Sequence, residues 1–147
     1  MRYFEDVEIG EKTVSRGRTV TETDIVNFAA LSGDWFPLHT NVEFAKNGPF
    51  GERIAHGMLV LSIASGLLPT ADLAVVAFYG MDKVRFTAPV KIGDTIHVEM
   101  EVAEKQDKGG AGVVNFKESV KNQRDEDVAV SMFKVMLEKA PSCGCGA

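Results

Sequence analysis

Apolar and polar residues alternate along several segments in the second half of the chain, which is typical of β-strands with one covered face. The strand-like segments are residues 74–80, 82–90, 94–105, 112–122 and 127–139. The stretches KIGD, DKGGAG and NQRDED separate the later segments and are typical of turns. In the third segment, one face carries Ile96, Val98, Met100 and Val102. This period of two predicts long antiparallel strands.

A different pattern occupies residues 54–69, IAHGMLVLSIASGLLP, where apolar residues surround the whole segment instead of following one stripe. Such a pattern predicts a helix that is buried on every side. The segment is too short to cross a bilayer, its Ala, Gly and Ser residues disfavour a strand, and Pro69 ends it. One buried helix followed by long antiparallel strands predicts an α+β domain whose sheet curls around the helix, the hot-dog architecture.

A third pattern marks an earlier helix and its end. Thr21 in the stretch TETD is a suitable N-cap with Asp24 three residues later, and apolar residues then recur at helical spacing up to Ala29. Gly33 is typical of a helix C-terminus. Asp34 is therefore expected just past the end of this helix.

The stretch SGDWFPLHTN, residues 32–41, places a carboxylate and an imidazole in an apolar setting, with Asp34 five positions before His39. Because Pro37 cannot extend a helix and biases the preceding residue toward an extended conformation, we expect a loop here instead of a helical turn. A loop can aim both side chains at one point, and such a pair can share general acid–base catalysis worth ~10²–10⁴-fold in rate. On spacing alone, a structural interpretation is favoured: Asp34 caps the stretch NVEFA, residues 41–45, or stabilises a turn, and His39 is a half-buried, satisfied residue.

The stretch IAHGML places Gly57 at the start of the buried helix, where unpaired N–H groups and the helix dipole favour negative charge. A backbone N–H there can stabilise an oxygen that gains charge, as in an oxyanion hole. Close backbone packing is the alternative reason for a glycine at this position. His56 is expected to cap or pack and not to act as a second base. Ser62 is expected to bond the carbonyl four residues back or, alternatively, to line a pocket.

Composition and charge restrict the possible functions. The 147 residues, 45% hydrophobic and 25% charged, suit one folded domain, which we expect over residues 1–140. The net charge of −5 and the lack of a basic run argue against nucleic-acid binding. No apolar stretch reaches the ~20 residues of a membrane-spanning helix, and the first residues do not resemble a secretory signal, so we expect a cytoplasmic protein with no membrane partner.

Both cysteines lie in the C-terminal stretch PSCGCGA, residues 141–147. Cys143 and Cys145 follow the last strand-like segment and are flanked by Pro and Gly, which predicts a flexible tail. Two thiols cannot complete a four-ligand zinc site within one chain. A solvated tail is therefore the favoured interpretation, and metal binding shared between chains is the alternative.

Residues 28–45, FAALSGDWFPLHTNVEFA, followed by residues 54–62, IAHGMLVLS, resemble the MaoC-like dehydratase family, also known as (R)-specific enoyl-CoA hydratases. The family's signature is an aromatic residue, an aliphatic residue, then S/T-G-D-x-N-P-aliphatic-H and a small residue six positions later. The positions that fit are Phe28, Leu31, Ser32, Gly33, Asp34, Pro37, Leu38, His39 and Ala45. Phe36 stands where the family usually has asparagine, which would reshape a pocket wall without removing a proton-transfer group.

The resemblance implies a single hot-dog domain that adds water reversibly to a trans-2-enoyl thioester, carried by CoA or a carrier protein, to give a 3-hydroxyacyl thioester. It implies that Asp34 and His39 form the catalytic pair and that the N–H of Gly57 polarises the thioester carbonyl. Ser62 and Phe36 would line the substrate site. The reaction requires no metal and no redox cofactor, and relatives of this kind imply a homodimer or a higher homo-oligomer.

Two other functions remain open at this point. A hot-dog thioesterase would use the same class of ligand, but many such enzymes carry a carboxylate on the central helix, and residues 55–68 contain no Asp or Glu. A non-catalytic protein that binds acyl thioesters is the second alternative, since Phe36 could occlude the pocket. The presence of both Asp34 and His39 argues against it.

Overall fold

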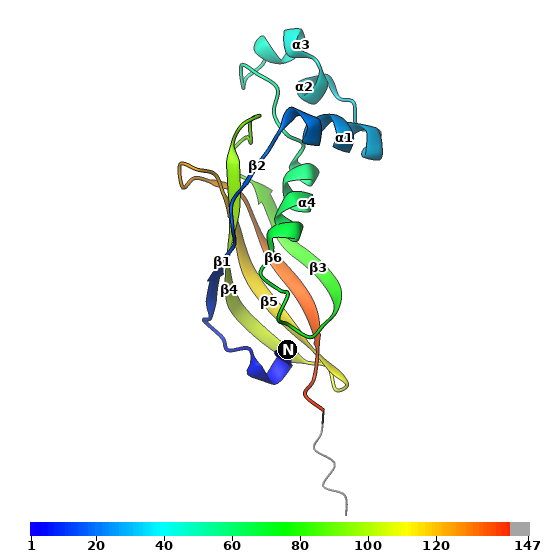
Figure 1. Ribbon diagram of the computed structural model, residues 1–147, viewed down its shortest axis with the longest axis vertical. Coiled ribbons are helices and arrows are strands. Elements are labelled where there is room, and N and C mark those ends of the chain that lie inside the picture. The colour runs from blue at the N-terminus through cyan, green and yellow to red at the C-terminus, as the bar shows by residue number, and fades with distance from the viewer. Residues whose placement is uncertain (142–147) are drawn as a thin grey trace, which may run out of the picture.

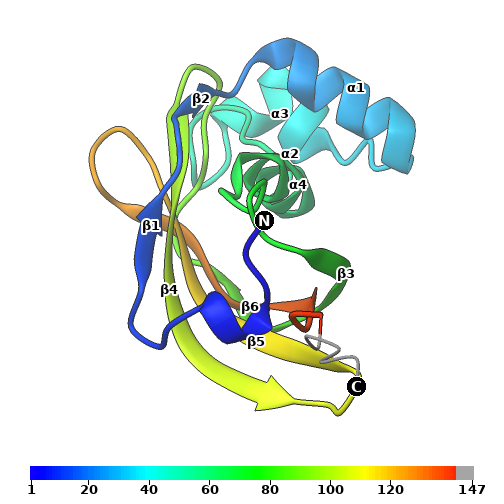
Figure 2. The same ribbon diagram turned by 60° about the horizontal axis from the view of Figure 1, so that its bottom comes forward.

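The structure is a computed structural model that describes residues 1–141, and its central feature is an antiparallel sheet that curls around one helix (Figure 1, Figure 2). The strands follow the order β1-β4-β5-β6-β3 across the sheet, and β2 also pairs with β4. All of these pairings are antiparallel. The strands are β1 Lys12–Val14, β2 Arg18–Thr19, β3 Val75–Phe86, β4 Thr95–Asp107, β5 Ala111–Lys121 and β6 Asp127–Glu138. The predicted α+β class is confirmed.

The alternation in the third strand-like segment is also confirmed, because its apolar face in β4 is buried. The division of residues 74–80 and 82–90 into two strands is wrong. Both segments contribute to the single strand β3, which pairs with β6 through irregular positions. The register shifts lie between Val75 and Ala77, between Phe78 and Gly80, and between Asp82 and Arg85. Bulges of this kind take up an extra residue without ending a strand, so the glycine in this segment does not act as a break.

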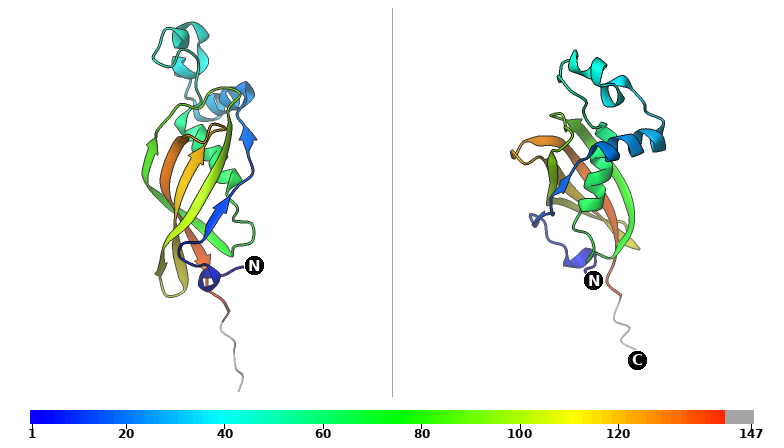
Figure 3. Two further views of the ribbon diagram at one scale, coloured as in Figure 1. Left: turned by 90° about the vertical axis from the view of Figure 1, so that its left-hand side faces the viewer. Right: turned by 45° about the horizontal axis from the view of Figure 1, so that its top comes forward.

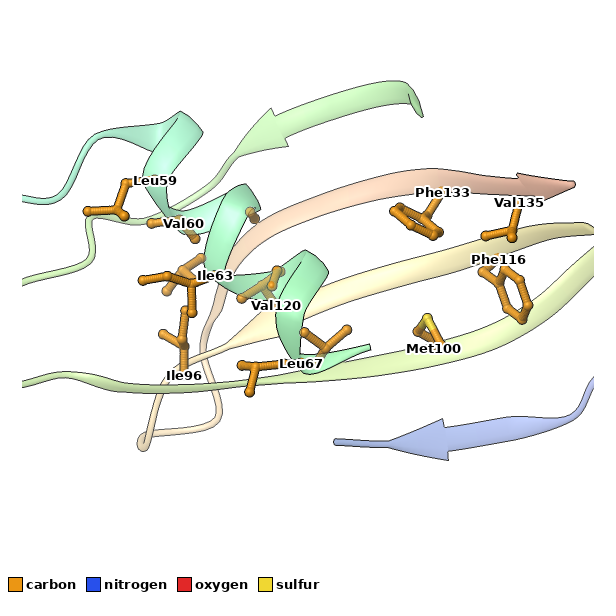
Figure 4. Close-up of a cluster of buried hydrophobic side chains, with 14 of the residues drawn as sticks. Leu59, Val60, Ile63, Leu67, Ile96, Met100, Phe116, Val120, Phe133 and Val135 are labelled. Carbon is orange, nitrogen blue, oxygen red and sulfur yellow. The ribbon is translucent and has the colours of Figure 1, made fainter. Parts of the chain in front are cut away.

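The helix inside the curled sheet is α4, Gly57–Leu67. Figure 4 shows its apolar side chains Leu59, Val60, Ile63 and Leu67 directed toward the strands. The residues of β4, β5 and β6 that complete this cluster include Ile96, Met100, Phe116, Val120, Phe133 and Val135. Burial of this apolar surface is the main favourable term that holds the helix against the sheet.

The prediction that this helix is buried on every side is wrong for the single chain. Met58 is 61% exposed, and Ser62, Ser65 and Gly66 are exposed as well. The reason is that the sheet covers only one side of α4. The helix begins at Gly57, as expected for the start of the buried helix. The apolar segment extends further back, to Ile54, which forms a bridge with Lys91.

Three helices lie beyond one end of the sheet: α1 Glu22–Ser32, α2 Pro37–Thr40 and α3 Val42–Lys46 (Figure 3). A short 3-10 turn, η1 Phe4–Asp6, lies near the opposite end (Figure 1). The predicted start of α1 is confirmed, since the Thr21 side chain accepts a hydrogen bond from the Asp24 N–H and the Asp24 side chain accepts one from the Thr21 N–H. The predicted end is confirmed by Gly33, whose φ of 77° is left-handed.

Asp34 follows this helix end directly, as expected. The prediction of a loop up to His39 is only partly right, because Pro37 is the first residue of α2 and places His39 in a helical turn. Proline lacks a donor N–H and has a helix-compatible φ, so it is well suited to the first position of a helix. The loop is therefore limited to the residues between Gly33 and Pro37.

Among the described residues, none of the helices is long and apolar enough to cross a membrane. Cys143 and Cys145, for which the sequence predicts a tail position, lie outside the residues that the structure describes.

Candidate active site

A cavity of about 490 Å³ lies at the N-terminal end of α4. Its wall contains Asp34 from the loop before α2, His39 from α2, Gly57 from α4 and Phe86 from the end of β3. The rest of the lining is largely apolar and includes Phe28, Phe50, Ile54, Val60, Pro89 and Val90. The fold therefore brings the two candidate catalytic residues and the candidate oxyanion donor to one cavity.

The position of Asp34 is set by the turn that ends α1. Its backbone N–H donates to Ser32 Oγ at 3.2 Å, and one oxygen of its carboxylate accepts from the N–H of Phe36 at 3.2 Å. Part of the structural interpretation therefore holds, since Asp34 stabilises its own turn. It does not cap α3, the helix within the stretch NVEFA, because the side chain of Asn41 does so by accepting from the N–H of Phe44. The carboxylate remains exposed to the cavity.

His39 is half-buried and uses one ring nitrogen to fix its orientation. Its Nδ1 lies 2.8 Å from the carbonyl oxygen of Ile54. Because a carbonyl can only accept, Nδ1 carries the proton and Nε2 retains a free lone pair. One carboxylate oxygen of Asp34 and one ring nitrogen each of His39 and His56 lie within 4.8 Å of one another. A single water molecule can contact two groups at this separation.

His56 contacts both catalytic candidates, the ring of His39 and the backbone of Asp34. Its side chain is 2% exposed, and its ring stacks on that of His39 with the centroids 3.9 Å apart. Its Nε2 lies 3.0 Å from the backbone carbonyl of Asp34, to which it donates. The expected packing role is therefore confirmed, while the N-cap position of His56 carries no side-chain capping bond. The sequence did not reveal the bond to Asp34, which joins residues far apart in the chain.

Gly57 is the first residue of α4, and the first-turn N–H groups of a helix have no acceptor within it. A Cβ at this position would lie 2.6 Å from Cζ of Phe86. Close packing, the alternative reason for this glycine, is therefore present together with its position on the cavity wall. Phe86 is a lining residue that the sequence did not single out.

Two other predicted substrate-binding residues lie outside this cavity. The Oγ of Ser62 donates to the carbonyl of Met58 at 2.7 Å, the bond expected for a helix serine, and its side chain lines a separate cavity along α4. Phe36 is 54% exposed, and its ring meets that of His39 edge-on with the centroids 6.3 Å apart. Phe36 therefore contacts His39 without being part of the cavity wall.

Asp34, His39 and His56 each have a potential metal-ligating atom, and these atoms are close enough together for a metal site to be considered. The two imidazole rings are stacked, with an interplanar angle of 29°. Since the lone pairs of an imidazole lie in the ring plane, those of two stacked rings do not converge on one point as a tetrahedral or octahedral ion requires. The geometry therefore suits acid–base chemistry better than metal binding.

Comparison with known proteins agrees with this arrangement. Residues 5–124 match the family described as MaoC like domain. The chain belongs to the MaoC-like domain family. The matched residues include helices α1 to α4 and strands β1 to β5, so the resemblance seen in the sequence motif is confirmed.

This MaoC-like domain is 40% identical over 142 residues to Protein MaoC of Klebsiella aerogenes, with 96% of the chain and 36% of the relative covered. It is 40% identical over 102 residues to a 3-hydroxybutyryl-CoA dehydratase of Methylorubrum extorquens, covering 69% of the chain and 64% of the relative. An (R)-specific enoyl-CoA hydratase of Rhodospirillum rubrum is also 40% identical over 102 residues, with 69% and 70% covered. The domain thus spans 36% and 64% of the lengths of the first two relatives.

Solved structures confirm the hot-dog fold of the MaoC-like domain. A monoamine oxidase regulatory protein from Archaeoglobus fulgius superposes with a TM-score of 0.89 at 50% identity, covering 95% of this chain and 96% of that one. A Mycobacterium tuberculosis protein described as a double hotdog fold superposes with a TM-score of 0.83 at 22% identity, covering 96% and 45%. The second likeness bears on the fold alone.

Proposed function

We propose that this chain is a hydro-lyase that adds water reversibly to a trans-2-enoyl thioester and forms a 3-hydroxyacyl thioester. The observation that carries the proposal is the convergence of the Asp34 carboxylate with a ring nitrogen of His39, within 4.8 Å, in one cavity at the N-terminus of α4. Two of the relatives act, by name, on thioesters of this class.

In the proposed mechanism, Asp34 and His39 hold one water molecule between them. Because Nδ1 of His39 donates to Ile54, its Nε2 can accept a proton from this water as the oxygen attacks Cβ of the substrate. The proton that the Asp34–His39 pair has taken from the water is then delivered to Cα from the same face, which returns the pair to its starting protonation state. The oxygen of the thioester carbonyl gains negative charge during the attack, and the N–H of Gly57 would stabilise it as an oxyanion-hole donor.

A thioesterase is the first alternative. The helix α4 contains no carboxylate that could attack or activate water in the way that many hot-dog thioesterases do. A binding protein without activity is the second alternative. Asp34 and His39 both line the cavity, and Phe36 is not among its lining residues, which argues against occlusion by Phe36.

The decisive experiment follows two signals with crotonyl-CoA and with longer 2-enoyl-CoAs. Loss of the absorbance of the conjugated thioester reports hydration, and release of free thiol reports hydrolysis. The proposal expects the first signal without the second. Thiol release with the alkene intact would instead identify a thioesterase, and the absence of both signals at every chain length would favour a binding protein.

We also infer that two copies of the chain pair through β3, which lies at one edge of the sheet. An unpaired edge strand presents a row of backbone donors and acceptors to another strand. This edge also carries exposed apolar side chains, namely Val75, Val76, Phe78 and Tyr79. A second copy is the occupant that matches a strand with itself, because antiparallel pairing of two identical edges is two-fold symmetric.

A further inference from the structure

A second cavity, of about 420 Å³, runs along the exposed side of α4. It begins at Met58, which also lines the candidate active site, and reaches Leu68 at the end of the helix. With a rise of about 1.5 Å per residue, these ten positions correspond to roughly 15 Å. A group attached to a thioester at the N-terminus of α4 could therefore extend along the helix into this cavity.

The lining of this cavity is largely apolar apart from a few hydroxyls, with one charged exception. The apolar residues include Leu61, Val75, Phe78, Met81, Phe133 and Val135. The exception is Glu118 of β5, which is 2% exposed. A carboxylate in an apolar environment is unfavourable unless its oxygens are hydrogen-bonded. The sequence contains the signal for this residue, because strand alternation places Glu118 on the same face as the buried Phe116 and Val120.

Only part of the hydrogen-bonding capacity of Glu118 is used. Ser131, directly opposite on β6, donates to Oε2 at 2.6 Å. Within residues 1–141, no donor is hydrogen-bonded to Oε1. Burial raises the pKa of this carboxyl, and the hydrogen bond from Ser131 opposes the shift. Glu118, a residue of the cavity wall, thus keeps one acceptor oxygen without a donor among residues 1–141.

The neighbouring hydroxyls on α4 offer acceptors too. The hydroxyl of Ser62 donates a hydrogen bond to the carbonyl of Met58, and the hydroxyl of Ser65 donates one to the carbonyl of Ser62. Their oxygen lone pairs remain, while their hydrogens are occupied. This side of the cavity therefore presents acceptors and suits a ligand that brings a donor. A neutral hydroxyl meets this requirement without the cost of burying a second charge.

We propose that this cavity holds the acyl group of the thioester and that Glu118 accepts a hydrogen bond from a hydroxyl on the distal part of that group. The substrate class is then a hydroxylated 2-enoyl thioester rather than a plain hydrocarbon chain. This inference rests on the proposed hydratase function, since it assumes that the thioester lies at Asp34 and His39.

The test compares pairs of 2-enoyl-CoAs of equal length, one ending in a hydroxyl and one in a methyl group, across a series of chain lengths. At the chain length that reaches Glu118, the wild-type kcat/KM should favour the hydroxyl substrate by about tenfold, as expected for one hydrogen bond that the methyl substrate cannot make. Glu118→Leu should reverse this preference, and the isosteric Glu118→Gln should weaken it. Glu101→Gln, on β4 and outside the cavity, is the matched control that keeps the wild-type preference.

A wild-type enzyme with no preference at any chain length, or a preference that survives in Glu118→Leu, would overturn the inference. Hydration of crotonyl-CoA by the wild type tests the proposed function separately. Calorimetry with saturated acyl-CoA pairs measures the same preference as binding, so it decides the inference even if the chain hydrates nothing. Circular dichroism of both Glu118 variants separates loss of the contact from loss of the fold, and Glu118→Gln preserves the shape of the side chain if Glu118→Leu does not fold.

Discussion

His39 uses its two ring nitrogens for different tasks, and this division makes its side chain suitable as a base. Nδ1 is committed to the carbonyl of Ile54, which leaves Nε2 as the acceptor. The ring is held from one face by His56, which also bonds the backbone of Asp34. Two contacts of one buried residue thus hold both members of the pair, so their relative position does not depend on the exposed loop alone.

Replacement of either member of the pair should remove most of the activity. We expect Asp34→Asn and His39→Ala each to lower kcat/KM for crotonyl-CoA by ~10²–10⁴-fold, the range for loss of a general acid or base. The double variant should be little worse than either single one, because the two residues act on the same water molecule. Hydration rates and circular dichroism spectra are the measurements.

The control for these variants is His97→Ala, which changes a histidine on β4 outside the cavity and should retain activity. A near-normal rate for Asp34→Asn or His39→Ala in a folded protein would contradict the assigned mechanism.

The buried carboxyl of Glu118 should make stability depend on pH. Its pKa is raised by burial, so between the ordinary glutamate pKa and the raised value the folded chain keeps a proton that the unfolded chain has lost. The contribution of Glu118 to the free energy of unfolding therefore decreases as the pH rises through this window. Glutamine does not titrate. The stability of Glu118→Gln relative to wild type should consequently increase with pH over the same window.

Urea unfolding from about pH 4 to about pH 8 measures this difference. Ser131→Ala offers a matched comparison, because it removes the hydrogen bond that lowers the pKa of Glu118 and should steepen the pH dependence. A difference between Glu118→Gln and wild type that is constant with pH, or that shrinks as the pH rises, would show that the carboxyl is not perturbed.

At the scale of elements, local signals predicted the features that depend on neighbouring residues. The capping box at Thr21, the left-handed Gly33 and the alternation in β4 all follow from a few adjacent positions, and all are found. The position of Asp34 at a helix end follows from them. Its meeting with His39 was implied by the resemblance to the family, because the spacing alone favoured structural roles for both residues.

Features that depend on contacts between distant residues could not be predicted from local sequence signals. β3 continues past Gly80 because its pairing with β6 outweighs the local turn preference. The exposed side of α4 did have a local signal, because Ser62, Ser65 and Gly66 share one helical face and are exposed. The many apolar residues around them obscured this signal. The stack of His56 on His39 joins α4 to α2 through tertiary packing alone.

The contact between α4 and β3 at the cavity wall should be sensitive to a single methyl group. Gly57→Ala places a Cβ where it would lie 2.6 Å from Cζ of Phe86, so the aromatic ring must move within the cavity. We expect kcat/KM to fall by roughly tenfold to a hundredfold, as for small displacements near reacting atoms. Phe86→Leu in the same chain should restore part of the lost activity by relieving the contact.

Gly66→Ala is the matched control for this variant, since it adds the same methyl group to α4 with no atom within 4 Å. It should keep its activity and gain about 0.5–1 kcal/mol in the free energy of unfolding from the better helix propensity of alanine. Equal activity of Gly57→Ala and Gly66→Ala would show that the position of Phe86 does not matter for the reaction.

At the scale of the whole molecule, the exposed surfaces that could contact a second copy lie close together. The exposed face of α4, the open side of the second cavity and the edge of β3 are neighbours, because Met58, Ser65, Val75 and Phe78 all line that cavity. Phe78 also stacks on Phe133, which fixes the edge against the sheet. A second copy paired at β3 would extend the sheet and lie beside the cavity of its neighbour.

This arrangement predicts that one charged residue on the β3 edge will separate the copies. A lysine at an edge strand opposes pairing, because its charge would have to be buried against the partner. Val76→Lys should therefore shift the mass measured by light scattering from dimer to monomer, and hydration of longer enoyl-CoAs should fall more than that of crotonyl-CoA. Val14→Lys adds the same charge at the exposed β1 edge and should leave a dimer. A wild-type chain that is monomeric at the concentrations of the assay, or a Val76→Lys variant that stays dimeric, would place the interface elsewhere and leave the second cavity as a surface of the single chain.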